Sequence, residues 1–536
     1  MKTRITQLML FCVFALAITS CQKKASNEAT AAFGRVVPAP VSSNADGGAL
    51  ILTKESTIGA IGGDAAVANY LGGLLRPATG FEFPVKENDQ DATIVLELVQ
   101  DTAYAAEGYR LSVGSKQVRI TAANPAGLFY GVQTLRQILP DAIEASEVQD
   151  REWEIATGEI TDKPAYGWRG SMLDVARHFF GMDVVKRYID LIALYKMNVL
   201  HLHLSDDQGW RIEIKSWPNL ALHGGTTEVG GDKGGYYTQE QYKELIAYAA
   251  ARFVTIIPEI DMPGHTNSAL ASYGELNGGT IVPEEGRINI PANSPILLGG
   301  KPRPTELYTG TEVGFSTLRL EKEATIRFVN DVVRELSEIT PGPYMHIGGD
   351  EAHVTKKDDY IGFVNKFTEI VKKNGKVMVG WEEIAQGDID SNAIVQHWTN
   401  PKYAKMAAEK GARILMSPST RVYLDMQYDS LTRLGLHWAA YIEADDAYNW
   451  DPATQVDGID ASSIMGVEAP LWGETIDSMD DIEYLLFPRI TAVAEVGWTP
   501  GASRSFDNYK LRIAEHSPRW KLMGIDNYPS ARIPWK

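Results

Sequence analysis

The amino-acid sequence predicts an α/β protein whose main body is a (β/α)8 TIM barrel, preceded by a small α+β domain. From Trp168 onward, short apolar runs alternate with longer amphipathic stretches, as in parallel strands joined by helices. Eight of these runs have the length of buried strands, and eight is the number that closes such a barrel. The runs are 168–173, 199–204, 253–258, 344–347, 377–380, 393–397, 413–417 and 464–471.

The stretches between the runs carry the signals of helices. Thr238 followed by Gln241 has the form of a capping box, which favours a helix start at this point. An open doubly wound sheet is the alternative arrangement, but no glycine-rich phosphate-binding sequence follows the first run. We therefore assign residues 161–536 to the barrel. The expected helices are 183–197, 238–252, 321–339, 360–373 and 482–496.

Residues 36–160 show a different, mixed pattern that predicts the α+β domain. Alternating apolar and polar residues flank Gly114-Ser115, which indicates a hairpin. This part of the chain shows no concentration of catalytic residue types, so we do not expect the active site there. The expected strands are 49–52, 92–98, 109–113 and 117–121, and the expected helices are 64–75 and 125–139.

The N-terminus has the features of a targeting segment. Lys2 and Arg4 precede an apolar run over 8–18 that is too short to span a bilayer comfortably. The run ends in Ile18-Thr19-Ser20-Cys21, which resembles a bacterial lipobox. An ordinary signal peptide with a chance cysteine is the alternative.

The expected outcome is an exported bacterial lipoprotein, periplasmic or anchored at the outer membrane or cell surface. Residues 1–20 would be the signal peptide, Cys21 would carry the lipid, and residues 21–35 would form a tether. Cleavage before Cys21 leaves one of the two cysteines, so no internal disulfide is expected in the mature protein.

The overall charge limits the kinds of partner. The 536 residues carry a formal net charge of −18, whereas nucleic acids and anionic membrane surfaces are bound by basic patches. We therefore expect no nucleic-acid partner, and contact with a membrane through the lipid anchor only.

The sequence Gly348-Gly349-Asp350-Glu351 follows the fourth apolar run and is the most informative motif. Neighbouring side chains on a continuing strand point to opposite faces. Two adjacent acids that serve one site therefore indicate a strand that has just ended, and glycines let the backbone turn there. A carboxylate pair at a strand end indicates acid–base chemistry.

Charged or aromatic residues also follow the other seven runs, at the end of the barrel where active sites lie. Aromatic rings stack on the apolar faces of sugars, and carboxylates and arginines bind hydroxyl groups, so the set indicates a pocket for one sugar ring. The residues are Arg177 and His178; His201, His203, Asp206 and Asp207; Glu259, Asp261 and His265; Trp381, Glu382 and Glu383; Trp398; Tyr423 and Asp425; Trp472 and Glu474.

Glycoside hydrolysis needs a proton donor and a group that stabilises C1 from the other side. Glu351 can be the donor if burial or the charge of Asp350 holds its pKa up. Adjacent carboxylates do not naturally flank a sugar, which suggests that the nucleophile is not a side chain.

Several motifs in a fixed order resemble family 20 glycoside hydrolases, the β-N-acetylhexosaminidases, over most of the mature chain. The motifs stand at 124–131, 173–179, 201–211, 258–265, 346–351, 380–383 and 471–474. The resemblance implies an exo-acting enzyme that removes terminal non-reducing GlcNAc or GalNAc from oligosaccharides or glycoconjugates, with retention, no cofactor and no metal. The 2-acetamido oxygen of the substrate would attack C1 and form an oxazolinium intermediate.

The resemblance also implies roles for residues. Glu351 would be the general acid and then the general base, Asp350 would orient the acetamido N–H, and Tyr423 would bind the acetamido oxygen. The remaining residues would bind the sugar ring (Arg177, Trp381, Trp398, Asp425, Trp472 and Glu474) or support Glu351 (Asp206, His265 and His203).

Two alternatives remain at this point. His201 and His203, with His265 and Asp350, could form the metal cluster of an amidohydrolase on a barrel. The chain could also be a non-catalytic glycan-binding lipoprotein, although Glu351 is present. The sequence leaves open the gluco or galacto preference, the natural glycan and the oligomeric state. The loops 221–237 and 267–318 are expected on the rim of the barrel.

Overall fold

Eight parallel strands close into a barrel, so the predicted fold class is confirmed. The structure is a computed structural model that describes residues 23–536 except 64, 102, 103 and 300. Each predicted run overlaps a barrel strand, and β17 pairs with β8 to close the ring. The strands are β8 (Trp168–Asp174), β9 (Val199–His203), β10 (Thr255–Glu259), β13 (Tyr344–His346), β14 (Val377–Trp381), β15 (Ile394–His397), β16 (Arg413–Met416) and β17 (Ile464–Leu471).

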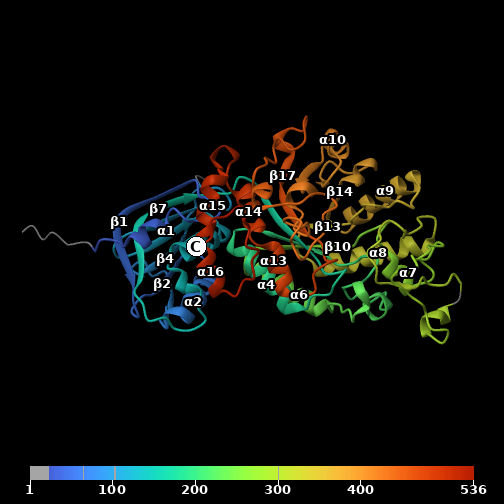
Figure 1. Cartoon of the computed structure of the whole chain (residues 1–536), viewed down its shortest axis with the longest axis horizontal. Coiled ribbons are helices and arrows are strands. Elements are labelled where there is room, and N and C mark those ends of the chain that lie inside the picture. The colour runs from blue at the N-terminus through green and yellow to red at the C-terminus, as the bar shows by residue number, and fades with distance from the viewer. Residues whose placement is uncertain (1–22, 64, 102–103, 300) are drawn as a thin grey trace, which may run out of the picture.

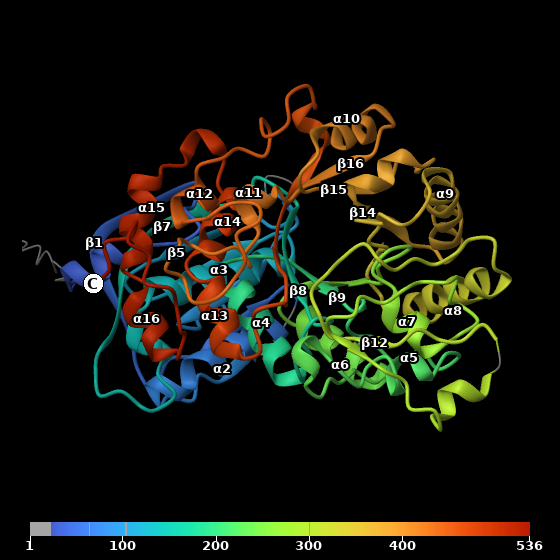
Figure 2. The ribbon, with the colours of Figure 1, turned by 45° about the vertical axis from the view of Figure 1, so that its right-hand side comes forward.

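Helices surround the strands (Figure 2). The capping box at Thr238 is present, since its hydroxyl accepts from the Gln241 amide at 3.1 Å and Gln241 bonds back at 2.9 Å. The longer helices are α4 (Met182–Leu194), α6 (Gln239–Ala250), α8 (Glu323–Ile339), α9 (Lys357–Lys373) and α10 (Pro401–Glu409), and the shorter ones are α5 (Asn219–Leu222), α7 (Asn267–Ser272), α11 (Ser419–Val422) and α12 (Ala444–Tyr448).

The single helix predicted over 482–496 is wrong. The structure has two helices, α13 (Met479–Leu486) and α14 (Arg489–Trp498), separated at Phe487 and Pro488. Proline lacks the amide hydrogen that a continuing helix needs and its ring crowds the preceding turn, so the chain breaks there.

A seven-stranded mixed sheet precedes the barrel. Its strand order is β1-β7-β5-β6-β4-β2-β3, with antiparallel pairs on the β1 side and parallel pairs on the β3 side. The strands are β1 (Ser42–Leu52), β2 (Ile58–Ile61), β3 (Val85–Glu87), β4 (Ile94–Leu98), β5 (Tyr109–Val113), β6 (Val118–Ala122) and β7 (Trp153–Asp162).

Helix α3 (Pro125–Ile138) joins this sheet to the barrel, while α2 (Ala65–Thr79) packs beside it. Phe129 of α3 contacts Phe253 with ring centroids 5.3 Å apart, and Tyr130 meets Trp498 edge-on at 5.3 Å. Because α3 contacts the sheet on one side and barrel residues on the other, it is buried on almost all faces, and the two bodies share one continuous core.

The tether predicted over 21–35 ends earlier than expected. The amide of Ala49 bonds to the carbonyl of Lys23 at 2.9 Å, and α1 (Asn27–Ala32) follows with Ser26 as its cap. Phe33 is only 3% exposed. The folded part of the chain therefore includes residues from Lys23 onward, while the predicted signal peptide and Cys21 lie outside the described residues.

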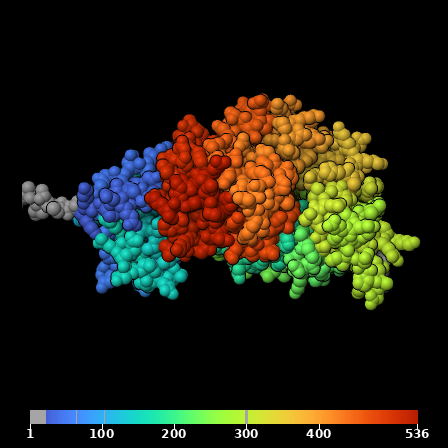
Figure 3. Space-filling view, viewed as in Figure 1, coloured from blue at the N-terminus to red at the C-terminus, as the bar shows by residue number. Residues whose placement is uncertain are grey.

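The C-terminal helices α15 (Phe506–Ala514) and α16 (Ser517–Leu522) lie at the junction of the sheet and the barrel in the view of Figures 1 and 3. Arg512 donates to the carbonyl of Val36 at 2.8 Å, and Arg519 pairs with Asp141 at 3.3 Å and with Glu144. The last turns of the chain are thus bound to its N-terminal domain.

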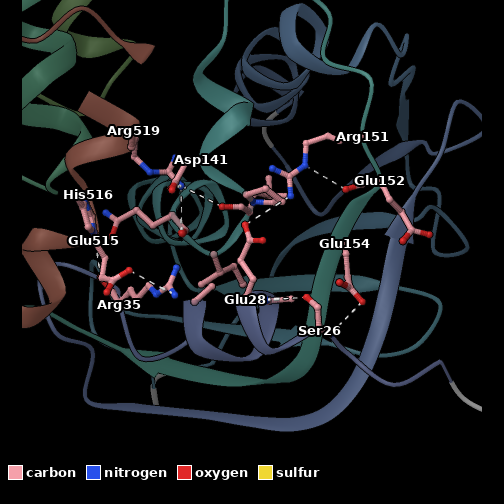
Figure 4. A pocket seen from close by; sticks show the side chains of 16 residues that line it. Ser26, Glu28, Arg35, Asp141, Arg151, Glu152, Glu154, Glu515, His516 and Arg519 are labelled. Atoms are coloured by element: carbon pink, nitrogen blue, oxygen red, sulfur yellow. Dashed lines mark hydrogen bonds and ion pairs between the residues drawn. The ribbon is translucent and has the colours of Figure 1, made fainter. Parts of the chain in front are cut away.

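A cavity of about 280 Å³ lies at this junction (Figure 4). Its charged side chains pair with one another across the walls, for example Arg35 with Glu515 at 3.5 Å and Arg151 with Glu28 at 3.6 Å. The Arg35–Glu515 pair joins the two bodies, whereas Arg151 and Glu28 both belong to the N-terminal body. No helix within the described residues is long and apolar enough to cross a membrane.

We expect Glu144 to stabilise this junction in a pH-dependent way. Burial alone would raise its pKa, but Arg136 and Arg519 lower the pKa of Glu144 to about 2 from a usual value of 4.5. Because the folded-state pKa is depressed, the stabilisation is complete above pH 4.5 and is lost as the pH falls toward 2. Glu144→Gln should lower the unfolding free energy at pH 7 by about 3 kcal/mol.

Urea unfolding at pH 7 and pH 3 measures this effect, and the exposed neighbour Glu147 provides the matched control as Glu147→Gln. The difference between Glu144→Gln and the unaltered protein should shrink at pH 3. A loss that is equal at both pH values would show that the carboxylate charge does not carry the effect.

Candidate active site

The predicted site residues gather around a cavity of about 230 Å³ at the carboxyl ends of the barrel strands. Eight of them line it, and four further residues complete the wall. The lining residues are Arg177, Thr311, Val313, Asp350, Glu351, Trp398, Tyr423, Asp425, Leu436, Trp438, Trp472 and Glu474.

A glycine turn directs the two adjacent acids into this cavity. After β13 the chain passes through Gly348 at φ 67° and Gly349 at φ 101°, and Glu351 itself has φ 44°. A Cβ on Gly348 would lie 1.9 Å from Oδ1 of Asp261, which also accepts the Gly349 amide at 2.9 Å. Only glycine fits this approach, and the turn lets neighbouring carboxylates share one site.

His265 faces both acids. Its Nε2 lies 3.6 Å from Oε2 of Glu351 and 3.7 Å from Oδ2 of Asp350, while its Nδ1 lies 3.1 Å from Oδ1 of Asp206. Burial works against the imidazolium, but Asp206 and Glu351 raise the pKa of His265 well above its usual range. A proton is therefore held on His265, next to Glu351.

The pKa of Glu351 does not follow the expectation drawn from the sequence. Burial does act to raise it, but the hydrogen bond and charge of His265 outweigh burial and lower the pKa of Glu351 below its usual value. The expected effect of burial and Asp350 is thus reversed by the imidazolium in front of the carboxylate.

Asp206 connects several parts of the site. Its Oδ2 lies 2.8 Å from Nη2 of Arg177 and 3.0 Å from Nε2 of His203. Burial disfavours the charged form, yet Arg177 and His265 hold the pKa of Asp206 well below its usual range. A permanent carboxylate therefore links the sugar-binding arginine to the histidine beside Glu351.

Below this level the barrel interior is filled by histidines and acids. Glu259 lies 2.9 Å from Nδ1 of His346 and contacts both His203 and His201. Its Oε1 also accepts from the indole of Trp381 at 2.9 Å. Trp381 is 1% exposed and stands behind Trp472, so it backs the pocket without lining it.

Unpaired polar atoms mark where a ligand would be held. Within the described residues, neither carboxylate oxygen of the buried Asp425 has a hydrogen bond of ordinary geometry, nor have Oε2 of Glu474, Nε of Arg177 and Oδ1 of Asp350. Burial and the charge of Glu474 raise the pKa of Asp425 well above its usual range. Unsatisfied buried groups on this scale indicate a site built to bind hydroxyl and amide groups.

Aromatic rings form the wall opposite these polar groups. Trp398 lies nearly parallel to Tyr423, with ring centroids 6.4 Å apart and an angle of 14°. Trp438 meets both rings edge-on at 6.0 and 5.9 Å and is 55% exposed at the mouth.

Sequence reasoning missed Trp438, Thr311 and Val313, which line the pocket from long loops. These loops have no periodic pattern, so only the presence of a tryptophan after the seventh strand could have drawn attention to Trp438. The long loop between α7 and α8, which carries Thr311 and Val313, also contains β11 (Arg287–Ile288) and β12 (Leu307–Tyr308).

The metal alternative is not supported by this arrangement. Within the described residues, His201 and His203 each lie in a separate close group with Glu259, whereas His265 and Asp350 share a group with Asp261, so the four residues do not converge on one point. His201 and His203 instead both contact Glu259 inside the barrel.

Comparison with known proteins agrees with the geometry. The model of the glycosyl hydrolase family 20 catalytic domain matches residues 166–360 and 353–501, and the model of domain 2 of that family matches 34–163. A beta-N-acetylhexosaminidase from Cellulomonas fimi is 40% identical over 491 residues, 91% of this chain and 93% of the relative. A beta-hexosaminidase from Porphyromonas gingivalis is 30% identical over 95% of this chain and 67% of the relative.

Solved structures give the same result. The N-acetyl-beta-hexosaminidase of Streptomyces plicatus in complex with Thio-NAglucal is 48% identical, with a TM-score of 0.87 over 94% of this chain and 98% of that one. A mutant of that enzyme in complex with its product GlcNAc matches equally well. The barrel with its glycine-turn acids, the preceding sheet and these matches together show that the chain belongs to glycosyl hydrolase family 20.

Proposed function

We propose that the protein removes terminal non-reducing GlcNAc or GalNAc from oligosaccharides or glycoconjugates by a retaining, substrate-assisted mechanism. One observation carries this proposal: Asp350 and Glu351 enter one closed pocket from adjacent positions, together with the hydroxyl of Tyr423. The relatives named above, one of them with GlcNAc bound, support the choice of sugar.

The acetamido group of the substrate supplies the nucleophile. Its carbonyl oxygen attacks C1 and the glycosidic bond breaks, while Oδ1 of Asp350, which lacks a protein partner, accepts the acetamido N–H. Burial and the charge of Asp350 raise the pKa of Tyr423 well above its usual range, so its hydroxyl stays protonated and donates to the acetamido oxygen. The positive oxazolinium that forms is balanced by the carboxylate of Asp350.

Glu351 moves the proton in both steps. It donates to the leaving oxygen as the bond to C1 breaks, and it then takes a proton from the water that opens the oxazolinium ring. The raised pKa of His265 and the lowered pKa of Glu351 place the proton of this pair on His265, whose Nε2 lies 3.6 Å from Oε2 of Glu351. When a substrate excludes water from Glu351, its carboxylate loses solvation, which favours transfer of the proton to Glu351.

The remaining polar groups fix the sugar ring. Arg177, Asp425 and Glu474 offer unpaired buried atoms for its hydroxyl groups, and Trp472 and Trp398 offer ring faces. Because these groups line one small cavity of about 230 Å³, we infer that it takes a single terminal sugar ring, which accounts for exo action.

We also propose that Cys21 carries a lipid and that the protein is exported and anchored, in the periplasm or at the cell surface. The support is the lipobox-like sequence before Cys21 and the folded residues that begin shortly after it. The mass of the mature N-terminus tests this, and we expect it to start at a diacylated or triacylated Cys21. An unmodified Cys21 in the mature protein would refute the anchor.

Glu351→Gln should remove proton donation and keep the shape of the pocket. General acid help is worth about 10²–10⁴-fold, so hydrolysis of an N-acetylglucosaminide with a poor leaving group should fall by that factor. A dinitrophenyl N-acetylglucosaminide, whose leaving group needs no proton, should show a much smaller loss in the bond-breaking step. Equal losses of kcat/KM on the two substrates would contradict the donor role.

Asp350→Asn should disable the acetamido nucleophile. We expect kcat to fall by about 10²-fold or more, because the neutral amide cannot stabilise the oxazolinium charge.

The unaltered enzyme should act on N-acetylglucosaminides or N-acetylgalactosaminides and not on glucosides with a plain hydroxyl at C2. Turnover of such glucosides at a similar rate, or an inverted product seen by NMR, would overturn the proposed function.

A further inference from the structure

His265 has a backbone conformation that calls for an explanation. Its φ is 53°, in the left-handed region that residues other than glycine rarely adopt. Such strain persists only where surrounding contacts impose it, and it concentrates at functional sites. His265 carries the proton that faces Glu351, so whatever fixes its backbone also fixes the distance between Nε2 and that carboxylate.

Two buried side chains bind the backbone immediately after His265. The amide of Thr266 donates to Oγ of Ser316 at 2.8 Å, and the amide of Asn267 donates to Oδ1 of Asp207 at 2.8 Å. The hydroxyl of Ser316 in turn donates to the same Oδ1 of Asp207 at 2.5 Å. Ser316 and Asp207 are both buried, so no water competes for these bonds.

Ser316 belongs to the long loop between α7 and α8, which forms part of one wall of the pocket. Thr311 and Val313, a few residues earlier, line the cavity. A Cβ on Gly314 would lie 3.1 Å from the carbonyl oxygen of Glu351 and closer still to His353, so this segment runs directly along the proton donor. The side of the sugar that faces Glu351 is the side of the leaving group, which places the segment beside the aglycone.

We propose that Ser316 and Asp207 form a clamp, a pair of side chains that fixes the backbone beside His265 and so keeps Nε2 of His265 opposite the carboxylate of Glu351. The clamp also links the wall of the pocket on the side of the leaving group to proton donation. The two are positioning residues, since neither touches the sugar. The proposal rests on the proposed function above, because it assigns the clamp to the acid step of that reaction. Burial and the neighbouring Asp206 raise the pKa of Asp207 to about 6, while the hydrogen bonds from the Ser316 hydroxyl and the Asn267 amide act to lower it.

Ser316→Ala tests the clamp, because it removes the hydroxyl that joins Thr266 to Asp207. His265 should then relax, and help with proton donation should weaken. We expect kcat/KM to fall about 10–100-fold on a phenyl N-acetylglucosaminide, a part of the 10²–10⁴-fold that general acid catalysis provides. On the dinitrophenyl substrate the change should stay below about threefold, since that leaving group needs no proton. Inhibition by the product GlcNAc should not change.

The neighbouring Thr317→Val is the matched control. Thr317 is as deeply buried on the same segment, but its hydroxyl bonds to Leu318 and Thr355 and not to the backbone beside His265. It should affect both substrates equally and slightly. Asp207→Asn, which keeps an acceptor oxygen in place, should share the selective loss on the phenyl substrate at a smaller size.

The possible outcomes distinguish a failure of the clamp proposal from a failure of the proposed function. If the unaltered enzyme hydrolyses N-acetylglucosaminides but Ser316→Ala loses activity equally on both leaving groups, or loses none, the clamp is wrong and the function stands. If Ser316→Ala fails to fold, Asp207→Asn decides, through the comparison of its losses of kcat/KM on the phenyl and dinitrophenyl substrates. If the unaltered enzyme has no such activity, the function fails and the clamp with it.

Discussion

The carboxylate of Asp206 is the interaction on which the site depends. It is bound at once by the arginine of the sugar pocket, by a histidine of the barrel interior and by His265. If its charge were lost, Arg177 and His265 would remain as buried cations without this shared partner, and a buried charge without a partner is strongly destabilising. Sugar binding, proton supply and the packing of the barrel core are therefore not independent features of this protein.

The glycine turn after β13 solves a geometric problem that the mechanism poses. Two acids with different tasks must reach one sugar, and adjacent residues of an extended strand cannot do so. Left-handed backbone at Gly348 and Gly349 redirects the chain within two residues, and Asp261 fills the space that a side chain at position 348 would need. The substrate then provides the group that a second flanking carboxylate provides in other glycosidases.

The sequence was sufficient for the barrel and for most of the pocket, because both depend on local patterns. Apolar runs located all eight strands, and their ends located Asp350, Glu351 and Tyr423. Other features depend on contacts between distant residues. The first half of β1 consists of small polar residues that become a strand only by pairing with β7, and Trp438 and Val313 reach the pocket from loops without periodicity. The lowered pKa of Glu351 depends on a histidine 86 positions earlier in the chain.

The position of the last two helices has a consequence for biogenesis. Because Arg512 of α15 and Arg519 of α16 bind Val36 and Asp141 of the N-terminal domain, these contacts cannot form before the end of the chain has been synthesised. The buried Glu144, which already contacts Arg136 of its own domain, gains its second arginine, Arg519, only at that stage. Both C-terminal helices are therefore needed for the complete set of contacts between the two bodies.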